Sequence, residues 1–477
     1  MASCWRGFAV RAQRRLGLHC LRFQSEASPS GLAAFSFWKG SLTPFEGESH
    51  MPTHGRGRFR LQRQLRDRWL VGIVLALTTA CSTAAHAQQT RTEQLEQQRA
   101  QRAREVKPEA RTKVEKALLY LDEHRLLQRV FTPEAGFYPQ FGSVTTGGGI
   151  ALGGGYRKPF ANDNLLFNTN AAFTLKGYRT GRVELSLPRL AKHTVEVKGR
   201  VRYRYFPQED FYGIGPGSQK ADRTNYLIEE TEYSVQVGWR PRRWLLLASQ
   251  SAFLNPRIAG GTDSLYPTTE ALFSEATAPG LTEQTNFLEN GGLVEVDYRD
   301  SRGNPRSGGR YVAYASRFDD RDNRGFDFSR VAGGVEQYVP IFDKKRVFAF
   351  RVAANHLDAA AGSQVPFYYM YPIGGKDTIR GFNDLRFRDT NSWVFNAEYR
   401  WEAFSGLDMA LFYDLGDVAP RFEDLSIRDA RDSYGLGFRF GTNQAVFLRA
   451  EIGFGSGEGT RFFVAFSGPL RIERFLR

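Results

Sequence analysis

The chain has 477 residues, of which 41% are hydrophobic and 24% charged, and its mean hydropathy is −0.44. This composition excludes a bundle of membrane helices, which needs repeated apolar runs of about 20 residues. The net charge is +14, but residues 1–87 hold 12 Lys and Arg against 4 Asp and Glu, which leaves 53 basic and 47 acidic residues, a net of +6, in 88–477. Such a small excess does not favour nucleic-acid binding.

A secretory signal peptide is predicted near the start of the chain. The apolar run 69–80 follows an arginine-rich stretch and precedes the small-residue cleavage site AHA at 85–87. These are the three parts of such a signal. We therefore expect residues 1–87 to be a presequence, and Met51 to be the true start, because a signal beginning at residue 1 would be unusually long.

The residues after this presequence give no pattern for a catalytic or metal site. All cysteines precede the predicted cleavage point, and the three remaining histidines are far apart: Cys4, Cys20, Cys81; His124, His193, His356. No nucleophile elbow, phosphate loop or metal-ligand spacing is present. The sequence therefore predicts no enzyme, no cofactor and no disulfide.

Residues 88–135 are predicted to form a polar arm followed by an amphipathic periplasmic helix. The segment 88–107 is rich in Gln and Arg, and Pro108 suits the first position of a helix. Apolar residues then recur at helical spacing up to about residue 130: Val114, Leu118, Leu121. The helix either packs at the mouth of the following domain or docks a periplasmic partner through 88–130.

From residue 136 to 477 the chain consists of segments with a two-residue period, separated by turn residues. In 194–205, Val and Tyr alternate with charged residues, including Arg200, Arg202 and Arg204. That face must meet water, since an arginine facing lipid costs about 2–4 kcal/mol near the midplane. The pattern predicts a polar, locally basic lumen. A soluble β-sandwich or repeat protein shares this period, but the signal peptide and the length favour a barrel.

The predicted fold is all-β: a transmembrane antiparallel β-barrel with about 16 strands. Strands that cross lipid must close into a barrel, because lipid offers the backbone no hydrogen bonds. A strand takes roughly 9–11 residues plus its connection, and the length of 136–477 accommodates about 16 of them, although counting alone would also allow about 14 or 18.

Glycines are concentrated in 145–156, which we predict to be the first strand, and before the closing strand, near 460–468. Glycine has no side chain to pack, so a first strand of this composition should pair poorly and leave a weak seam with the last. Simple accommodation of barrel curvature is the alternative. The glycines of the predicted seam are Gly147, Gly148, Gly149, Gly153, Gly154 and Gly155.

Two further segments, 393–402 and 409–416, place carboxylates on the face opposite their apolar side chains. If the apolar faces meet lipid, Glu398 and Asp414 both point into the lumen. Between them and the preceding strand, a loop at 368–391 carries GGKDTIRGF. The segment thus places a lone arginine, Arg380, near two acidic residues.

These strings resemble the BamA/TamA family of outer-membrane proteins, also called the bacterial surface antigen family. The loop-tip residues Ile379, Arg380, Gly381 and Phe382 match the family's V/I-R-G-F/Y tip, and the strand residues Phe412, Asp414 and Gly416 match its F-x-D-x-G motif. DYRDSRGNPRSGG at 297–309 and DFYGIG at 210–215 are also similar to family strings. The resemblance covers about 136–477, and only the combination is specific.

The resemblance implies that the loop folds back into the barrel and that its arginine contacts the strand motif. We therefore expect Arg380 to lie in the lumen between Glu398 and Asp414, because a buried charge must be paired. Phe382 should pack on the wall, and Gly381 should allow a tight turn. The loop then either braces the wall or takes part in gating and substrate engagement.

By resemblance, the protein lies among lipids of the Gram-negative cell outer membrane and inserts or translocates a protein or lipid substrate. Family members often carry periplasmic POTRA modules, for which 88–135 is too short. Two other functions remain open: a diffusion pore or small-solute channel, and a structural surface antigen or anchor for a periplasmic partner.

Overall fold

The computed structural model describes Glu96, Gln98, Tyr120 and residues 133–442 and 445–466. The chain divides into two compact units, Met1–Pro108 and Glu109–Arg477, and the fold below is that of the second unit. The predicted signal peptide and Met51 lie outside the described residues. So does the predicted arm and helix at 88–130, apart from the three residues named, which are helical.

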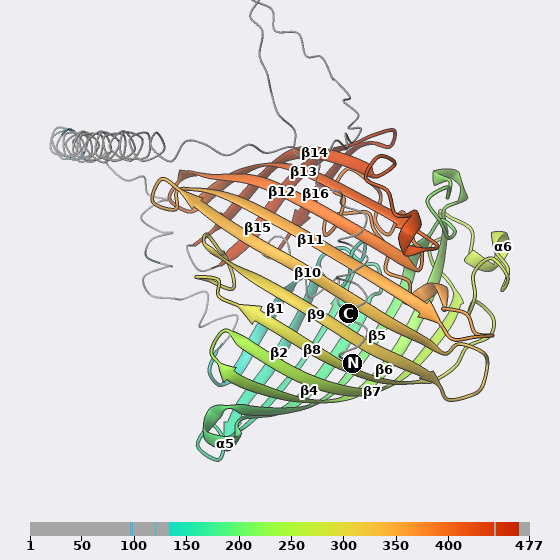
Figure 1. Cartoon of the computed structure of the whole chain (residues 1–477), viewed down its shortest axis with the longest axis horizontal. Helices are drawn as coiled ribbons and strands as arrows, with labels where there is room; N and C mark the ends of the chain where they lie inside the picture. The colour runs from blue at the N-terminus through green and yellow to red at the C-terminus, as the bar shows by residue number, and fades with distance from the viewer. Residues whose placement is uncertain (1–95, 97, 99–119, 121–132, 443–444, 467–477) are drawn as a thin grey trace, which may run out of the picture. The chain divides into compact units, whose positions relative to one another are not determined.

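Sixteen antiparallel strands form one sheet in which each strand pairs with its neighbours in sequence (Figure 1). The predicted all-β barrel of 16 strands is thereby confirmed. The strands are β1 (Gly136–Gly142), β2 (Ala151–Phe160), β3 (Leu165–Thr174), β4 (Arg179–Arg189), β5 (Val195–Phe211), β6 (Thr224–Arg242), β7 (Leu245–Gly260), β8 (Phe287–Asp297), β9 (Gly308–Asp320), β10 (Phe328–Ile341), β11 (Arg346–Ala359), β12 (Asn391–Phe404), β13 (Leu407–Ala419), β14 (Arg431–Gly441), β15 (Val446–Gly455) and β16 (Gly459–Ala465).

Between residues 133 and 466, the helical elements that the structure describes are single turns. They are α5 (Leu190–His193), α6 (Thr269–Leu272), and the 3-10 turns η1 (Lys220–Asp222), η2 (Phe367–Tyr369) and η3 (Phe422–Asp424). Among the described residues, no helix is long and apolar enough to span a membrane.

Side chains alternate between an exposed apolar outer face and a buried inner face. On β13, Leu411 and Tyr413 are exposed, whereas Phe412 and Asp414, one residue along, are buried. This is the two-residue period of a strand whose faces meet different surroundings. In a barrel, the outer face forms the apolar band that lipid covers, and the inner face lines the lumen.

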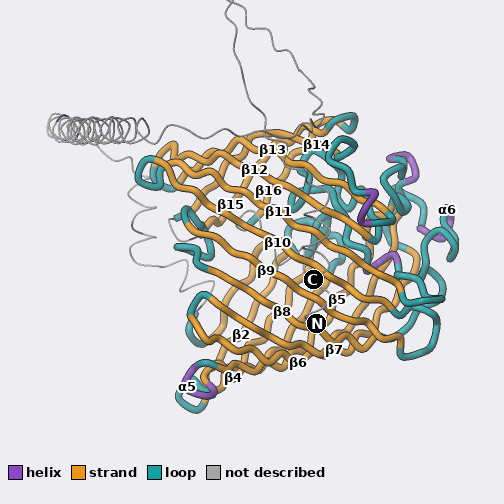
Figure 2. The backbone as a smooth tube through the Cα atoms, in the orientation of Figure 1, coloured by secondary structure: helices purple, strands orange, loops and turns teal. Residues whose placement is uncertain are grey.

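The connections differ at the two ends of the barrel (Figure 2). Those that follow even-numbered strands are mostly tight turns, such as 161–164 and 405–406, and this end is called the short-turn end. Those that follow odd-numbered strands include the long loops 261–286 and 360–390, and this end is called the long-loop end. At this end, aromatic side chains of the 360–390 loop pack against the ends of strands: Phe367 against Phe211 of β5, and Tyr369 against Phe287 of β8 and Phe328 of β10.

The sheet has a break between β1 and β16. In the part of the chain that the structure describes, each of these strands pairs with one neighbour only, although they end close together: a Cβ added to Gly142 would lie 3.4 Å from the carbonyl oxygen of Phe466. β1 also contains Pro139, and proline, which lacks an N–H, is tolerated at the edge of a sheet. The β1–β16 break is therefore the edge of an otherwise continuous ladder.

The prediction that 145–156 is the first strand is wrong. Residues Gly136–Gly142 form β1, so Gly147, Gly148 and Gly149 lie in the β1–β2 turn, and Gly153, Gly154 and Gly155 lie in the second strand. β1 lacks a clear two-residue alternation, because it contains Pro139 and has a glycine at each end.

The glycines of β2 also do not weaken pairing with β1. Seven residues of β1 pair with β2. The ring of Tyr138 lies where a Cβ on Gly155 would be, and its hydroxyl donates to Asn168 Oδ1 on β3 at 2.8 Å. The missing side chain thus lets Tyr138 cross β2 and tie β1 to β3, whereas the break lies on the other edge of β1.

Candidate functional site

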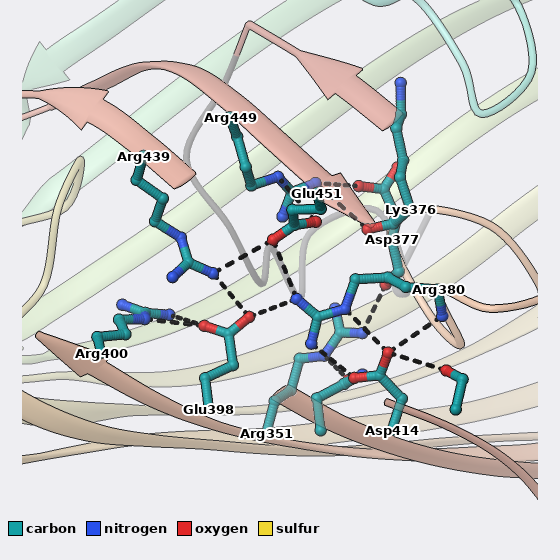
Figure 3. A network of polar contacts seen from close by, with 12 residues as sticks. Arg351, Lys376, Asp377, Arg380, Glu398, Arg400, Asp414, Arg439, Arg449 and Glu451 are labelled. Atoms are coloured by element: carbon teal, nitrogen blue, oxygen red, sulfur yellow. Dashed lines mark hydrogen bonds and ion pairs between the residues drawn. The ribbon is translucent and has the colours of Figure 1, made fainter. Parts of the chain in front are cut away.

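The β11–β12 loop, residues 360–390, carries Arg380 into the barrel interior, where this side chain is 1% exposed (Figure 3). Its Nε and Nη2 donate to Oδ2 and Oδ1 of Asp414 on β13, at 2.9 and 2.6 Å. Its Nη1 donates to Glu398 Oε1 on β12 at 2.6 Å and to Glu451 Oε1 on β15 at 3.1 Å. One guanidinium therefore joins three strands, with bidentate geometry at Asp414.

Further arginines of the wall complete this network (Figure 3). Glu398 also pairs with Arg400 at 2.7 Å and with Arg439 at 2.8 Å, and Glu451 lies 3.5 Å from Arg449. We call these residues the ion-pair cluster, and each is at most 4% exposed: Arg380, Glu398, Arg400, Asp414, Arg439, Arg449 and Glu451. Four cations and three anions nearly balance, as burial of charge requires.

An aromatic ring and a glycine position the arginine from one side. The Arg380 guanidinium lies 3.6 Å from the centre of the Phe412 ring, within the range of a cation–π contact. The ring occupies the place of a side chain on Gly435 of β14. Gly416, the last residue of the strand motif, faces Ile379, since an added Cβ would lie 3.2 Å from its Cγ2. Phe382 is buried against the wall together with Ile379.

Gly381 packs backbone to backbone on β15. A Cβ on Gly381 would collide with the backbone of Gly455, and one on Gly453 would lie 2.7 Å from the carbonyl oxygen of Arg380. The glycines of β15 are therefore a platform for the loop tip. This explains the glycine-rich stretch near the closing strand by close approach of another backbone.

The loop also contacts connections on both sides of the β1–β16 break. Toward β1, Lys376 Nζ donates to Ser143 Oγ at 2.8 Å, and Thr146 Oγ1 donates to Asp377 Oδ2 at 3.0 Å. Toward β16, Arg386 Nε donates to Glu458 Oε1 at 2.6 Å. A single loop thus links the two edges of the sheet.

One carboxyl of the loop stands apart from these pairs. Asp384 lies against Gly147 of the β1–β2 turn, and no ion pair reaches it among the described residues. Burial raises the pKa of Asp384, while the nearby charges of Lys376 and Arg461 oppose the rise. Protonation of Asp384 is therefore easier in the folded protein than in the unfolded chain.

The DFYGIG string ends at the base of the same loop. Asn383 Nδ2 donates to the Tyr212 hydroxyl at 3.2 Å, and the N–H of Gly215 donates to the carbonyl of Arg388 at 2.8 Å. The 297–309 string lies at the opposite, short-turn end, where Arg306 pairs with Asp408 of β13 at 2.8 Å. Three of the four strings noted in the sequence therefore meet at the loop, and the fourth braces the other end.

The structure brings all of the predicted loop-tip and lumenal residues together: Ile379, Arg380, Gly381, Phe382, Glu398, Phe412, Asp414 and Gly416. Sequence reasoning missed Glu451, Arg439, Arg400 and Arg449. On β15, Arg449 and Glu451 alternate in step with the lumen-facing glycines, and this alternation could have indicated that both side chains face the lumen. Within the described residues no group of His, Cys, Asp or Glu is suited to a metal ion.

Residues 162–463 match the Omp85 superfamily domain. The chain belongs to the Omp85 superfamily. This confirms the resemblance drawn from the loop and strand motifs, and it makes the sheet an outer-membrane barrel of the Gram-negative type.

One solved structure supports the barrel fold, and a second matches more weakly. The Omp85 barrel is similar to BamA from Haemophilus ducreyi lacking POTRA domains 1–3, with a TM-score of 0.53 and 12% identity over 74% of this chain and 78% of that one. CdiB from Acinetobacter baumannii matches with a TM-score of 0.44 and 13% identity over 69% and 59% of the two chains. No curated protein matched the sequence.

Proposed function

We propose that this Omp85 barrel inserts or translocates a protein or lipid substrate at the outer membrane, with the β11–β12 loop as an internal lock and the β1–β16 break as the exit. The family places the barrel in the outer membrane. The break supports the proposal because it is the one place where strands can separate without losing a pairing seen among the described residues.

The observation that carries the proposal is the position of the loop, which contacts both sides of the break and is anchored in the ion-pair cluster. Separation of β1 from β16 must break the contacts at Ser143 or at Glu458, or else move the loop. Movement of the loop exposes or separates the buried pairs of Arg380, which is strongly unfavourable. The barrel should therefore open only when a substrate offers compensating contacts.

We further propose that the chain reaches the outer membrane by the signal within 1–87, and that 88–130 is its periplasmic arm. The charged, apolar and small-residue parts of 1–87 support export. N-terminal sequencing of the protein from isolated outer membranes tests this: a start at Gln88 is expected, and retention of residues before it contradicts the assignment.

A disulfide across the break tests the exit. Residues 88–477 contain no cysteine, so Gly142→Cys combined with Phe466→Cys introduces a single pair. The protein in lipid vesicles is supplied with an unfolded small outer-membrane barrel as substrate. Oxidation should lower the rate of insertion at least tenfold, and reduction should restore it.

The two single-cysteine variants are the controls, and both should work at the unmodified rate under oxidising and reducing conditions. If the oxidised double-cysteine variant were fully active, separation of β1 from β16 would not be part of the mechanism. Steady, ion-selective conductance in a planar bilayer, together with no insertion by the unmodified protein, would replace the proposal with a diffusion pore.

A further inference from the structure

The lumenal wall of β4, β5 and β6 carries a row of arginines away from the β11–β12 loop tip. β5 contributes three of them at alternate positions, Arg200, Arg202 and Arg204, and the register of the sheet sets Arg182 of β4 directly opposite Arg202. Arg157 of β2 faces the same side, two strands away. We call these five residues the arginine wall.

The carboxylates of this wall do not satisfy all its arginines. Glu232 pairs with Arg200 at 2.6 Å and with Arg202 at 2.5 Å, and Glu230 pairs with Arg204 at 3.0 Å. Glu184 faces the same side, opposite Arg200, but forms no ion pair with it. Five cations thus stand against three anions.

Two arginines of the wall have no protein partner. Within the described ranges, no hydrogen bond or ion pair reaches Arg157 or Arg182, and their Nε atoms are buried without an acceptor. The Nε atoms of Arg200, Arg202 and Arg204 are likewise buried and unpaired. Donors of this kind normally find a partner, so five unfilled positions on one wall require an explanation.

The position of Arg182 directly opposite Arg202 does not stabilise the fold. Like charges directly opposite each other on neighbouring strands destabilise a sheet. The ion-pair cluster shows that this barrel balances charge where the wall is dry, whereas the arginines of β5 keep 20–24% of their side chains exposed. The excess charge therefore lies where a solute from the lumen can reach it.

We propose that the arginine wall binds a phosphate-bearing anion inside the barrel, with Arg182 and Arg202 as its central contacts and Arg157 at its edge. Guanidinium groups donate in a planar fork that matches phosphate oxygens, and a tetrahedral dianion can accept from more than one fork at once. A bound phosphate would also remove the repulsion between Arg182 and Arg202. The phosphate belongs either to a lipid headgroup or to a soluble organic phosphate.

Thermal unfolding of the whole protein in a non-ionic detergent tests this site. Inorganic phosphate and pyrophosphate are titrated, with sodium chloride at matched ionic strength as the reference. Both phosphates should raise the Tm saturably, and chloride should not. An equal response to chloride would overturn the proposal, because only general screening would remain.

Arg182→Gln should lose the phosphate response, with an apparent affinity at least tenfold weaker. Without phosphate its Tm should equal or exceed that of the unmodified protein, since the like-charge contact is gone; a merely structural arginine would give a lower Tm. Arg179→Gln is the matched control, because this residue lies on the same strand with its side chain exposed. A normal phosphate response in Arg182→Gln would overturn the proposal.

Two further probes distinguish the sources of the phosphate. Glycerol 3-phosphate represents a soluble compound, and dihexanoyl phosphatidic acid represents a lipid headgroup with short chains. Equal affinity for the two compounds supports a soluble ligand, whereas clearly tighter binding of dihexanoyl phosphatidic acid supports a lipid headgroup. Failure of both, with no response to inorganic phosphate, counts against the site. The test requires no insertion activity, so its result is independent of the function proposed above.

Discussion

The barrel has two arginine-rich lumenal walls that differ in what covers them. On β12–β15 the ion-pair cluster lies under the tip of the β11–β12 loop, and its members are at most 4% exposed. On β4–β6 the same residue types face the lumen, and the arginines of β5 remain 20–24% exposed. The carboxylates that pair with the β5 arginines, Glu230 and Glu232, are themselves buried, so the two walls differ in the exposure of their arginines. We expect the loss of a pair to cost less on β4–β6, because water reaches the arginine there and Glu232 has a second arginine partner.

Removal of the loop arginine should give the largest effect. Arg380→Ala leaves Glu398, Asp414 and Glu451 with fewer partners in a dry site, and breaking such a buried network typically costs about 3–5 kcal/mol. Urea unfolding in lipid vesicles measures this loss. Arg380→Lys should recover only part of it, because an ammonium group cannot make the bidentate contact with Asp414. An unchanged unfolding midpoint for Arg380→Ala would mean that the loop does not hold the wall.

The backbone contact between loop and β15 should give the next largest effect. Gly381→Ala places a methyl group against the backbone of Gly455, and such overpacking costs about 1–3 kcal/mol. Gly217→Ala is the control, since a Cβ there meets nothing within 4 Å. The difference in unfolding midpoint between the two variants is the measured quantity. Equal midpoints would show that the tip does not sit tightly on β15.

The partly exposed arginine wall should respond weakly to the loss of an ion pair. Arg202→Gln breaks the contact with Glu232 and also relieves Arg182, so its free energy of unfolding should change by no more than about 1 kcal/mol. The change in free energy should become smaller when the same unfolding experiment is repeated with salt raised from about 0.05 to about 0.5 M, because salt screens the interaction between partly exposed charges. A loss as large as that of Arg380→Ala would abolish the distinction between the walls.

Asp384 should give the smallest effect, with a defined pH dependence. Its pKa is raised in the folded state, so its ionised form lowers stability above that raised pKa, and the penalty disappears as pH falls below the unfolded value. Asp384→Asn should therefore raise the Tm slightly at pH 8 and lose this advantage only as the pH falls below the unfolded pKa of 3.8. A variant that is less stable than the unmodified protein at pH 8 would show that the carboxylate has a favourable contact.

The alternation of side chains made much of the site predictable. Glu398 and Asp414 lie on lumen-facing parity in segments whose apolar residues face outward, and a buried arginine needs such partners. Length gave the approximate number of strands, and the family resemblance favoured 16. These properties are local to one strand, or depend only on the total length, so the sequence alone carries them.

Properties that depend on which strands meet across the lumen were not predictable in this way. Glu451 is 71 residues from Arg380, and nothing in the alternation of β15 tells which loop will reach it. The role of Gly455 depends on the same contact. β1 was missed for another reason: Pro139 and the adjoining glycines disguise a strand that has only one paired edge.

The most direct test of the lock is a double-mutant cycle between the loop and β13. The free energy of unfolding in lipid vesicles is measured for the unmodified protein, Arg380→Ala, Asp414→Ala and the double variant. If Arg380 and Asp414 act as one buried unit, the double variant should be no less stable than the worse single variant, so the coupling should be about as large as the smaller of the two single losses. Losses that simply add would contradict the account, because the loop arginine and its carboxylate would then stabilise the barrel independently.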